Sequence, residues 1–348
     1  MSEATASKIP VTVLTGYLGA GKTTLLNRIL SENHGKKYAV IVNEFGEIGI
    51  DNDLIIGADE EVFEMNNGCI CCTVRGDLVR IMDGLMKRKG KFDAIIVETT
   101  GLADPAPVAQ TFFVDEDVQK NARLDAVVTV ADAKWLADRL KDAPEAKNQI
   151  AFADVIVLNK TDLVTKPELA EVEARIRGIN PYAKLHRTER CSVALADVLD
   201  RGAFDLDRIL DIEPDFLEVD DHDHEHDHHH GHDHHHHHDH GHGLKHYHDE
   251  DMQSLSLKTD KPLDPNVFMP WLQNLVQVEG GKILRSKGIL AFHDDDDRYV
   301  FQGVHMMLEG NHQRKWKDGE PRESRLVFIG RELPEKAIRE GFESCIVS

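Results

Sequence analysis

The chain has 348 residues and a formal net charge of −21 at pH 7, so it is long enough for two domains with separate cores. Its acidic excess argues against a nucleic-acid-binding surface, because such a protein repels polyanions. No apolar run approaches the roughly 20 residues of a membrane helix, and the N-terminus MSEATASKIP lacks the features of a signal peptide, so we expect a cytoplasmic protein without nucleic-acid or membrane partners.

The first two hundred residues alternate short β-branched runs with helical segments. The predicted strands are 11–15, 38–43, 62–65, 94–99, 126–131, 155–159 and 184–188, and the predicted helices are 23–32, 74–89, 105–113, 134–140, 145–153 and 167–178. Several of these strands are almost entirely apolar, as expected when helices cover both faces of a parallel sheet. The pattern predicts a doubly wound α/β domain whose ligand lies at the carboxyl ends of the strands.

The composition changes abruptly after this region. Residues 222–248 contain 16 of the 21 histidines, interleaved with Asp, Glu and Gly, and they predict a disordered linker because almost nothing there is apolar. The globular pattern then resumes, with predicted strands 254–258, 282–292, 299–304 and 325–329 and predicted helices 266–278 and 334–342. These segments predict an α/β domain over 1–213, a His/Asp-rich linker over 214–251 and a small α+β domain over 252–348.

The sequence GYLGAGKT, residues 16–23, lies between a predicted strand and a predicted helix, which is the context that a P-loop requires. In this arrangement glycines let backbone N–H groups close around phosphate oxygens at a helix N-terminus. We expect Lys22 to reach the terminal phosphates and the Thr23 hydroxyl to hold Mg²⁺. The predicted phosphate contacts are Gly16, Gly19, Ala20, Gly21, Lys22, Thr23 and Thr24.

The choice of nucleotide comes from NKTD at the end of the predicted strand 155–159. This sequence resembles the NKxD motif of P-loop GTPases, in which the aspartate binds guanine and the asparagine and lysine shape the base pocket. The resemblance makes Asp162 the base-binding residue and places Asn159 and Lys160 beside the base. We therefore expect GTP rather than ATP.

The segment between these motifs contains Glu98 at the end of a hydrophobic strand, an arrangement that supports Mg²⁺ directly or through water. Gly101 follows at a position from which its backbone N–H could approach the γ-phosphate. We assign catalytic roles to Lys22, Thr23 and Glu98. No side chain is identifiable as the activator of the attacking water, so intrinsic hydrolysis should be slow.

Three of the five cysteines, Cys69, Cys71 and Cys72, lie together between a predicted strand and a predicted helix. In a reducing compartment such a cluster indicates metal ligation or redox chemistry, and a helix N-terminus favours the thiolate form. Soft sulfur ligands select Zn²⁺ or Co²⁺ and exclude Mg²⁺. Glu47 is a candidate fourth ligand. The alternative is a redox dithiol or simply buried thiols.

Taken together and in this order, GYLGAGKT, NEFGEIGID, NGCICCTVRGDL, ETTGLADP and NKTD resemble the CobW-type metallochaperone GTPases, most closely their zinc-transferring branch. The later segments SKG, FQGV and VFIG resemble the C-terminal domain of the same family. The resemblance implies a P-loop GTPase that uses GTP and Mg²⁺, binds zinc at the CxCC loop and delivers it to client apo-metalloproteins under nucleotide control. Val42 departs from some members, which carry a glutamate metal ligand there.

Several alternatives stay open. The cargo could be cobalt for cobalamin biosynthesis, or the chain could be a metal storage or buffer protein with weak GTPase activity. We favour metal storage for the linker over a solvated spacer, because imidazoles offer many exchangeable sites. A nucleotide-dependent homodimer is left open as a further partner. The client is unassigned, because the N-terminal motif by which certain eukaryotic members recognise a client enzyme is missing.

Overall fold

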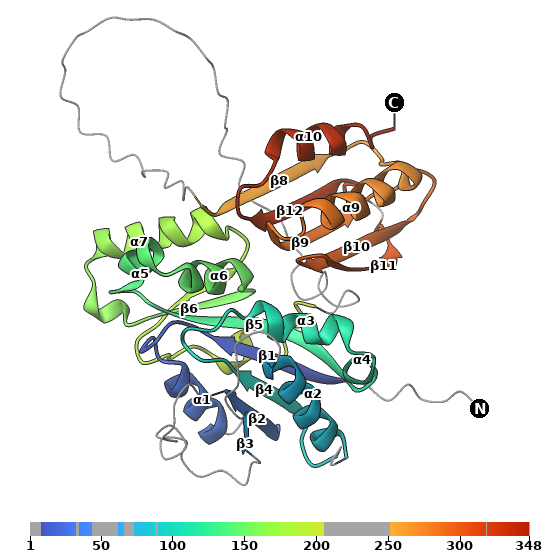
Figure 1. Cartoon of the computed structure of the whole chain (residues 1–348). Helices are drawn as coiled ribbons and strands as arrows, with labels where there is room; N and C mark the ends of the chain where they lie inside the picture. Colours follow the sequence, from blue (N-terminus) through green and yellow to red (C-terminus); the bar gives the residue numbers. More distant parts are fainter. Residues whose placement is uncertain are drawn as a thin grey trace, which may run out of the picture.

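The computed structural model describes residues 8–32, 35–43, 62–65, 73–87, 90–204, 251–317 and 319–347. Two sheets organise these residues: a seven-stranded sheet in the N-terminal part and a five-stranded sheet in the C-terminal part (Figure 1). The predicted linker 214–251 lies outside the described residues except for its last residue. In the described part, no helix is long and apolar enough to cross a membrane.

The seven-stranded sheet is parallel in every recorded pairing and has the order β3-β2-β4-β1-β5-β6-β7. Its strands are β1 (Ile9–Thr15), β2 (Tyr38–Asn43), β3 (Val62–Met65), β4 (Ala94–Glu98), β5 (Ala122–Asp132), β6 (Val155–Asn159) and β7 (Lys184–Arg187). The central strands β4 and β6 are buried along their whole length, which explains why their sequences are apolar without alternation.

The helices of this domain connect consecutive strands. They are α1 (Lys22–Ser31), α2 (Thr73–Met86), α3 (Ala106–Val114), α4 (Glu116–Asn121), α5 (Leu136–Asp142), α6 (Pro144–Phe152) and α7 (Lys166–Ile179). The crossover through α1 runs along the sheet in one direction, and the crossovers that contain α2 to α7 run in the other. Because such crossovers are right-handed, α1 covers one face of the sheet and α2 to α7 cover the opposite face.

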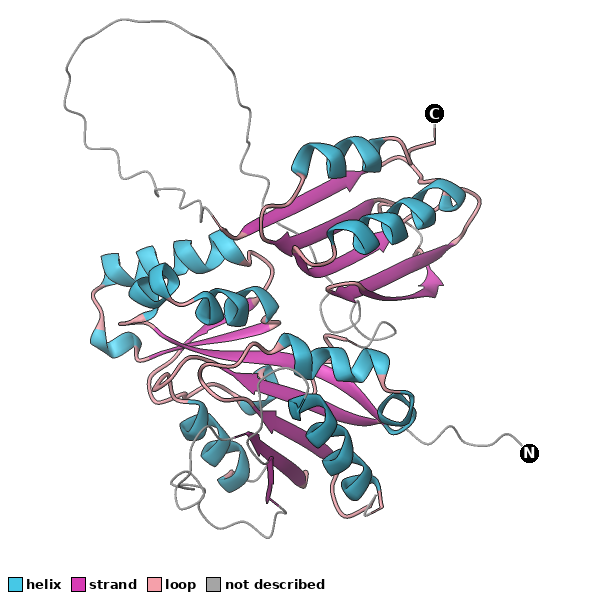
Figure 2. Ribbon diagram, viewed as in Figure 1, coloured by secondary structure: helices cyan, strands magenta, loops and turns pink. Residues whose placement is uncertain are grey.

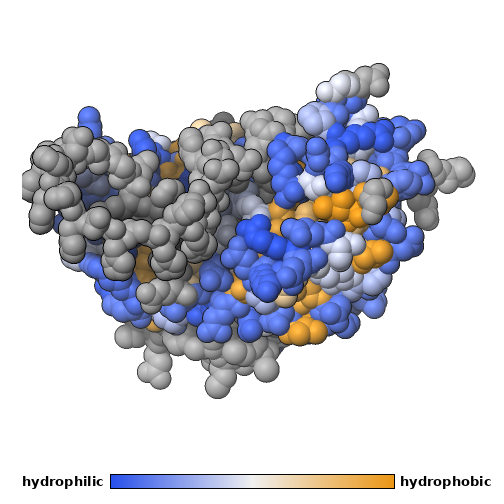
Figure 3. Space-filling view, turned by 90° about the horizontal axis from the view of Figure 1, so that it is seen from above, coloured by the Kyte–Doolittle hydropathy of each residue, from blue (hydrophilic) through white to orange (hydrophobic). Residues whose placement is uncertain are grey.

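The five-stranded sheet is antiparallel, with the order β11-β10-β9-β12-β8. Its elements are β8 (Gln253–Thr259), α9 (Pro265–Glu279), β9 (Ile283–Leu290), β10 (Asp297–Val304), β11 (Met307–Lys315), β12 (Ser324–Gly330) and α10 (Glu335–Glu343). Helices α9 and α10 cover one face (Figure 2), where Phe268, Phe301, Phe328 and Phe342 form an apolar core. The surface in Figure 3 is mainly hydrophilic, with smaller apolar patches between the polar residues.

The other face of the five-stranded sheet packs on the nucleotide domain. Its buried side chains Val300, Val304, Val327 and Ile329 join the apolar core of the N-terminal domain. The contacts come from α3, α6 and α7, all on the same face of the parallel sheet. The apolar core of the N-terminal domain therefore continues across the interface onto this face of the five-stranded sheet.

The predicted fold class is confirmed: a parallel-sheet P-loop domain is followed by a separate antiparallel-sheet domain with helices. The main differences from expectation concern α4, β11 and β5. The sequence did not predict α4, a six-residue helix capped by Asp115, whose side chain accepts from the backbone N–H groups of Asp117 and Val118. It also missed β11, an edge strand that buries none of its side chains fully, and β5 begins four residues earlier than predicted.

Candidate nucleotide site

The P-loop runs from the end of β1 to the start of α1, and its glycines have backbone conformations that other residues rarely adopt. Gly16, Gly19 and Gly21 have φ values of +142°, +74° and +119°. A Cβ at Gly16 would lie 2.2 Å from the carbonyl oxygen of Val130, and one at Gly21 would lie 2.6 Å from Nδ2 of Asn159. Gly16 and Gly21 therefore serve both turn geometry and close packing against β5 and β6, whereas Gly19 serves turn geometry.

The side chains at the start of α1 fit the roles predicted for them. The ammonium group of Lys22 donates to the Gly16 carbonyl oxygen at 2.9 Å, so it lies across the loop. Thr23 is half-buried in the first turn of α1. Glu98 is buried at the end of β4, in register with Leu14 of β1. Hydroxyl and carboxylate oxygens are the hard donors that Mg²⁺ prefers, so these residues fit that ion.

The NKTD segment is hydrogen-bonded to the P-loop. Asn159 is buried, and its amide donates to the Ala20 carbonyl oxygen at 3.0 Å. Lys160 donates to the Gly19 carbonyl oxygen at 2.7 Å and to Asp132 Oδ2 at 2.7 Å. Asp162 lies exposed in the short helix η2 (Thr161–Leu163). The segment predicted to bind guanine and the loop predicted to bind phosphate thus form one site.

Cys191 lies underneath this site. Its backbone N–H donates to Asn159 Oδ1 at 2.8 Å, and its thiol donates to the Gly21 carbonyl oxygen at 3.4 Å. Burial raises the pKa of the Cys191 thiol to about 11, so the group is protonated at neutral pH. Arg28 of α1 donates to the carbonyl oxygens of Cys191 and Val193. The chain after β7 is therefore fixed to α1 and to NKTD.

The loop after β4 packs directly on the P-loop. Thr99 donates its hydroxyl to Thr15 Oγ1 at 2.9 Å, and its backbone N–H donates to the Leu14 carbonyl oxygen at 2.9 Å. A Cβ at Gly101 would lie 2.6 Å from the backbone nitrogen of Leu18. The hydroxyl of Thr100 is buried and has no hydrogen-bond partner in the described part of the chain. This loop reaches the site with polar groups available to a ligand.

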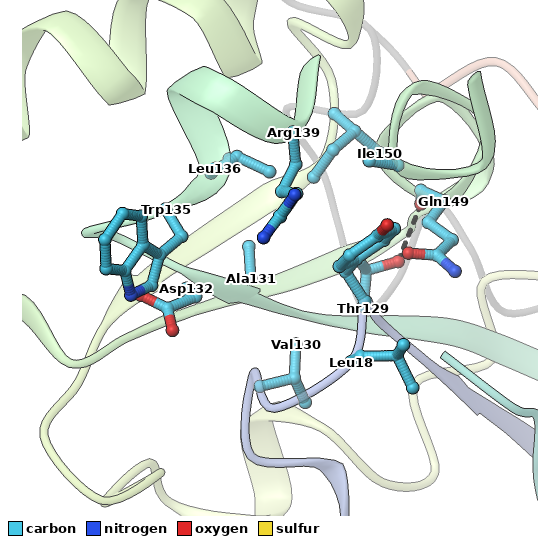
Figure 4. Close-up of a pocket in the computed structure, with 12 residues that line it drawn as sticks. Leu18, Thr129, Val130, Ala131, Asp132, Trp135, Leu136, Arg139, Gln149 and Ile150 are labelled. Atoms are coloured by element: carbon cyan, nitrogen blue, oxygen red, sulfur yellow. Dashed lines mark hydrogen bonds between the residues drawn. The ribbon is translucent and has the colours of Figure 1, made fainter. Parts of the chain in front are cut away.

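A cavity of about 140 Å³ lies between the P-loop residues Tyr17 and Leu18 and the end of β5 (Figure 4). Tyr17 and Leu18 of the P-loop, the end of β5, and helices α5 and α6 form its walls. The guanidinium of Arg139 lies over the Tyr17 ring, with 5.3 Å to the centroid. None of the predicted catalytic residues lines this cavity, so it adjoins the nucleotide site without being part of the predicted contacts.

The predicted metal ligands Cys69, Cys71, Cys72 and Glu47 all lie outside the described residues, so their assignment stays a prediction. Among the described residues, no group of three or more His, Cys, Asp or Glu side chains is arranged to hold a metal ion. The remaining cysteines, Cys191 and Cys345, are buried and unpaired by disulfides.

Sequence reasoning missed several residues that the structure brings to the nucleotide site. Asp132 pairs with Lys160, and it could have been found as a second acid ending an apolar strand. Cys191 and Thr100 gave no signal: a lone cysteine and a threonine after the acidic strand end have no motif that marks them. The site is otherwise assembled from the predicted P-loop, Glu98 loop and NKTD segment.

Comparisons with known proteins match both domains. The family model "CobW/HypB/UreG, nucleotide-binding domain" matches residues 10–187, and the model "Cobalamin synthesis protein cobW C-terminal domain" matches residues 252–346. The chain is 34% identical to the zinc chaperone YjiA of Escherichia coli strain K12 over 339 residues, which cover 96% of this chain and 98% of YjiA. It is 35% identical to the zinc chaperone CobW of Pseudomonas aeruginosa, with 96% of this chain and 90% of that protein covered.

Other comparisons extend this likeness to a fungal protein and to a solved structure. The chain is 35% identical to the zinc-regulated GTPase metalloprotein activator 1 of Schizosaccharomyces pombe, with 88% of this chain and 78% of that protein covered. The crystal structure of Zn(II)-bound YjiA GTPase from E. coli aligns with a TM-score of 0.73 at 28% identity, covering 98% of this chain and 100% of that one. The chain belongs to the CobW/HypB/UreG family and carries the CobW C-terminal domain.

Proposed function

We propose that this protein is a GTP-hydrolysing metallochaperone that binds zinc and transfers it to client metalloproteins, with nucleotide state controlling its zinc affinity. The observation that carries the proposal is the contact between NKTD and the P-loop. Through Asn159 and Lys160, a guanine-recognition motif and a phosphate-binding loop are fixed to each other at the carboxyl ends of the strands. Full-length similarity to proteins named as zinc chaperones supplies the cargo.

The preference for guanine rests on Asp162. Its carboxylate is exposed at the end of β6, next to a lysine in the left-handed conformation with φ +61°. A carboxylate accepts hydrogen bonds only, so it suits the N–H donors on the Watson–Crick edge of guanine and is mismatched to the ring nitrogen acceptor of adenine. Lys160 fixes the backbone that leads to Asp162, because its side chain is held by the Gly19 carbonyl oxygen and the Asp132 carboxylate.

Hydrolysis would use the residues at the strand ends. Lys22 would contact the terminal phosphates, and the backbone around Gly101 would face the γ-phosphate across the P-loop. Thr23 and Glu98 would hold Mg²⁺, which when bound neutralises charge on the β- and γ-phosphate oxygens. Thr100 offers a buried hydroxyl on the same loop. Without a dedicated base for the attacking water, turnover should be slow and open to control.

Zinc is the cargo, and we propose that Cys69, Cys71 and Cys72 bind it, with Glu47 as a further ligand. Three thiolates favour Zn²⁺ over hard cations, and a fourth position left to an exchangeable ligand permits transfer. Glu47 and the three cysteines lie in the chain between β2 and α2. Strand β2 pairs with β4, and β4 pairs with the P-loop strand β1. Loss of the γ-phosphate could therefore alter the zinc site through these connections.

The proposed zinc transfer also has consequences for the partners and the location of the protein. We propose client apo-metalloproteins as partners, a nucleotide-dependent homodimer as a further assembly, and the cytoplasm as the location. Thiols are kept reduced there, as the proposed thiolate ligands require. The His-rich segment 222–248 would hold additional metal at exchangeable imidazole sites.

The test measures steady-state GTP hydrolysis with Mg²⁺ and with Zn²⁺, Co²⁺ or neither. We expect GTP but not ATP to be hydrolysed, Lys22→Ala to abolish turnover, and Zn²⁺ to change turnover at one equivalent. Replacing Cys69, Cys71 and Cys72 with serine should remove the zinc effect while retaining basal hydrolysis. A response to Co²⁺ alone would reassign the cargo, and turnover indifferent to every metal would reduce the protein to a metal buffer attached to a GTPase.

A further inference from the structure

Helix α6 joins the nucleotide site to the C-terminal domain. We propose that Asn148 and Gln149 of α6 are positioning residues for GTP hydrolysis, and that Arg331 of the C-terminal domain acts on the reaction through Asn148. The C-terminal domain would then set the turnover rate by holding the loop of residues 99–105 against the P-loop. The inference rests on the proposed GTP hydrolysis and adds a control element to it.

The first step is the contact between the loop and the P-loop. Gly101 lies so close to Leu18 that a Cβ would meet its backbone nitrogen at 2.6 Å. The loop also carries the buried Thr100 hydroxyl, which has no partner in the described part of the chain, and it follows Glu98 directly. A small displacement of this loop would therefore move the groups that face the γ-phosphate relative to the P-loop amides.

The second step is the pair of hydrogen bonds by which Gln149 holds the loop. Its side-chain amide donates to the carbonyl oxygens of Gly101 at 3.1 Å and Ala103 at 3.2 Å. Gln149 is 1% exposed, and its own carbonyl oxygen accepts from the Thr129 hydroxyl of β5 at 2.7 Å (Figure 4). A buried amide with these partners fixes the distance between α6 and the loop.

The third step is Asn148, which connects the loop to the other domain. Its amide nitrogen donates to Asp104 Oδ2 at 2.8 Å, and its amide oxygen accepts from Arg331 Nη2 at 2.7 Å. A carboxylate only accepts and a guanidinium only donates, so this orientation of the Asn148 amide is the one that satisfies both partners. The other oxygen of Asp104 accepts from the Ala106 N–H at 2.9 Å, at the start of α3.

Further contacts attach the same helix to the C-terminal domain. Lys147 is buried and pairs with Asp251 at 2.9 Å, just before β8. At the end of α6, the Phe152 carbonyl oxygen accepts from Arg285 of β9. A nine-residue helix held in its middle and at its C-terminal end by these contacts will follow the C-terminal domain when that domain shifts. The hydrogen bonds from Asn148 and Gln149 to the loop then transmit the shift of the helix to the nucleotide site.

The test is a double-mutant cycle on the full-length protein, with GTP turnover and GTP KM as readouts. Asn148→Ala removes both contacts, and we expect kcat to fall roughly 10-fold, equivalent to about 1.4 kcal/mol, with GTP KM changed less than twofold. Arg331→Ala should lower kcat severalfold, and Arg331→Lys should recover part of the loss. In the Asn148→Ala background, Arg331→Ala should have no further effect, because the shared path is already broken.

Two variants separate positioning from general destabilisation. Asn148→Asp keeps an acceptor for Arg331 but places a negative charge against Asp104, so it should lower kcat as much as Asn148→Ala does. Arg339→Ala removes an exposed ion pair within α10, between Arg339 and Glu335, and should leave kcat unchanged.

Additive effects of Asn148→Ala and Arg331→Ala on kcat would overturn the proposal, as would a loss confined to KM. If the unmodified chain hydrolyses no GTP in a Lys22-dependent manner, the proposed function itself fails. If it hydrolyses GTP normally while the cycle is additive, only the role of α6 fails.

Discussion

The Asp154 carboxylate at the domain interface gives the sharpest stability prediction. Its side chain is 5% exposed and accepts from the Val127 backbone N–H at 2.8 Å, from Lys287 Nζ at 2.7 Å and from the Arg285 guanidinium. Burial alone would raise the pKa of Asp154, but the two cations from β9 outweigh it and lower that pKa. The carboxylate is therefore charged in the folded protein and holds β9 to the start of β6.

The change Asp154→Asn keeps the shape of the side chain and removes its charge. The Arg285 and Lys287 side chains, only 4% and 11% exposed, would then lose the negative charge of this carboxylate. Breaking a buried pair by removing one partner costs about 3–5 kcal/mol, which is a large part of the stability of an ordinary domain. We expect the free energy of unfolding to fall by this amount in urea titrations at pH 7 followed by tryptophan fluorescence and circular dichroism.

The pH dependence has a defined sign. Because the folded pKa of Asp154 is lowered, its contribution is complete above the unfolded value of about 3.9 and is lost as the pH falls through the lower folded pKa. Asp154→Asn should flatten the loss of stability in this acidic range. The matched control is Glu335→Gln, which removes an exposed pair with Arg339 and should cost less than about 1 kcal/mol. A loss below about 1 kcal/mol for Asp154→Asn as well would refute the assigned role of the buried charges.

Further predictions concern the nucleotide site. Gly21→Ala places a Cβ 2.6 Å from Asn159 Nδ2 and should weaken binding of a fluorescent GDP analogue more than tenfold. Gly19→Ala should weaken this binding less, because no atom lies within 4 Å of its Cβ. Equal losses of affinity would contradict the packing argument. Lys160→Ala removes the contacts with Gly19 and Asp132 and should lower GTP and GDP affinity together, measured by calorimetry; a selective loss of GTP would count against a base-side role. With a pKa of about 11, the Cys191 thiol should resist iodoacetamide at pH 8 in the folded chain and react in urea, as followed by peptide mass spectrometry; rapid labelling of folded protein would disprove its burial.

Local patterns predicted much of this structure, and the misses have physical causes. Strands such as β4 and β6 were visible because burial on both faces demands apolar side chains throughout. The edge strand β11, with the sequence MLEGNHQRK, is stabilised by backbone pairing to β10 and carries no alternation to detect. Helix α4 buries only Val118, so its six residues have no apolar periodicity.

In the candidate site, too, some features could be predicted from local sequence and others could not. The P-loop and NKTD could be predicted because each is contiguous and its spacing follows from phosphate and base chemistry. The long-range contacts around them could not: Cys191 meets Gly21 across 170 positions, and Arg331 meets Asn148 across 183. Such pairs depend on tertiary packing within and between the domains, which no local pattern encodes. Asp132 is intermediate, since its place at a strand end was visible but its pairing with Lys160 was not.

The central claim is that nucleotide state controls a thiolate zinc site. The most direct measurement is a competition titration of Zn²⁺ against Co²⁺ on protein lacking residues 220–250, with Mg²⁺ and either GDP or a non-hydrolysable GTP analogue. We predict one tight zinc site that forms with the GTP analogue, weakens with GDP and disappears when Cys69, Cys71 and Cys72 become serine. Because coupling is reciprocal, zinc should raise affinity for the GTP analogue by the same factor. Equal zinc affinity with both nucleotides would contradict the account.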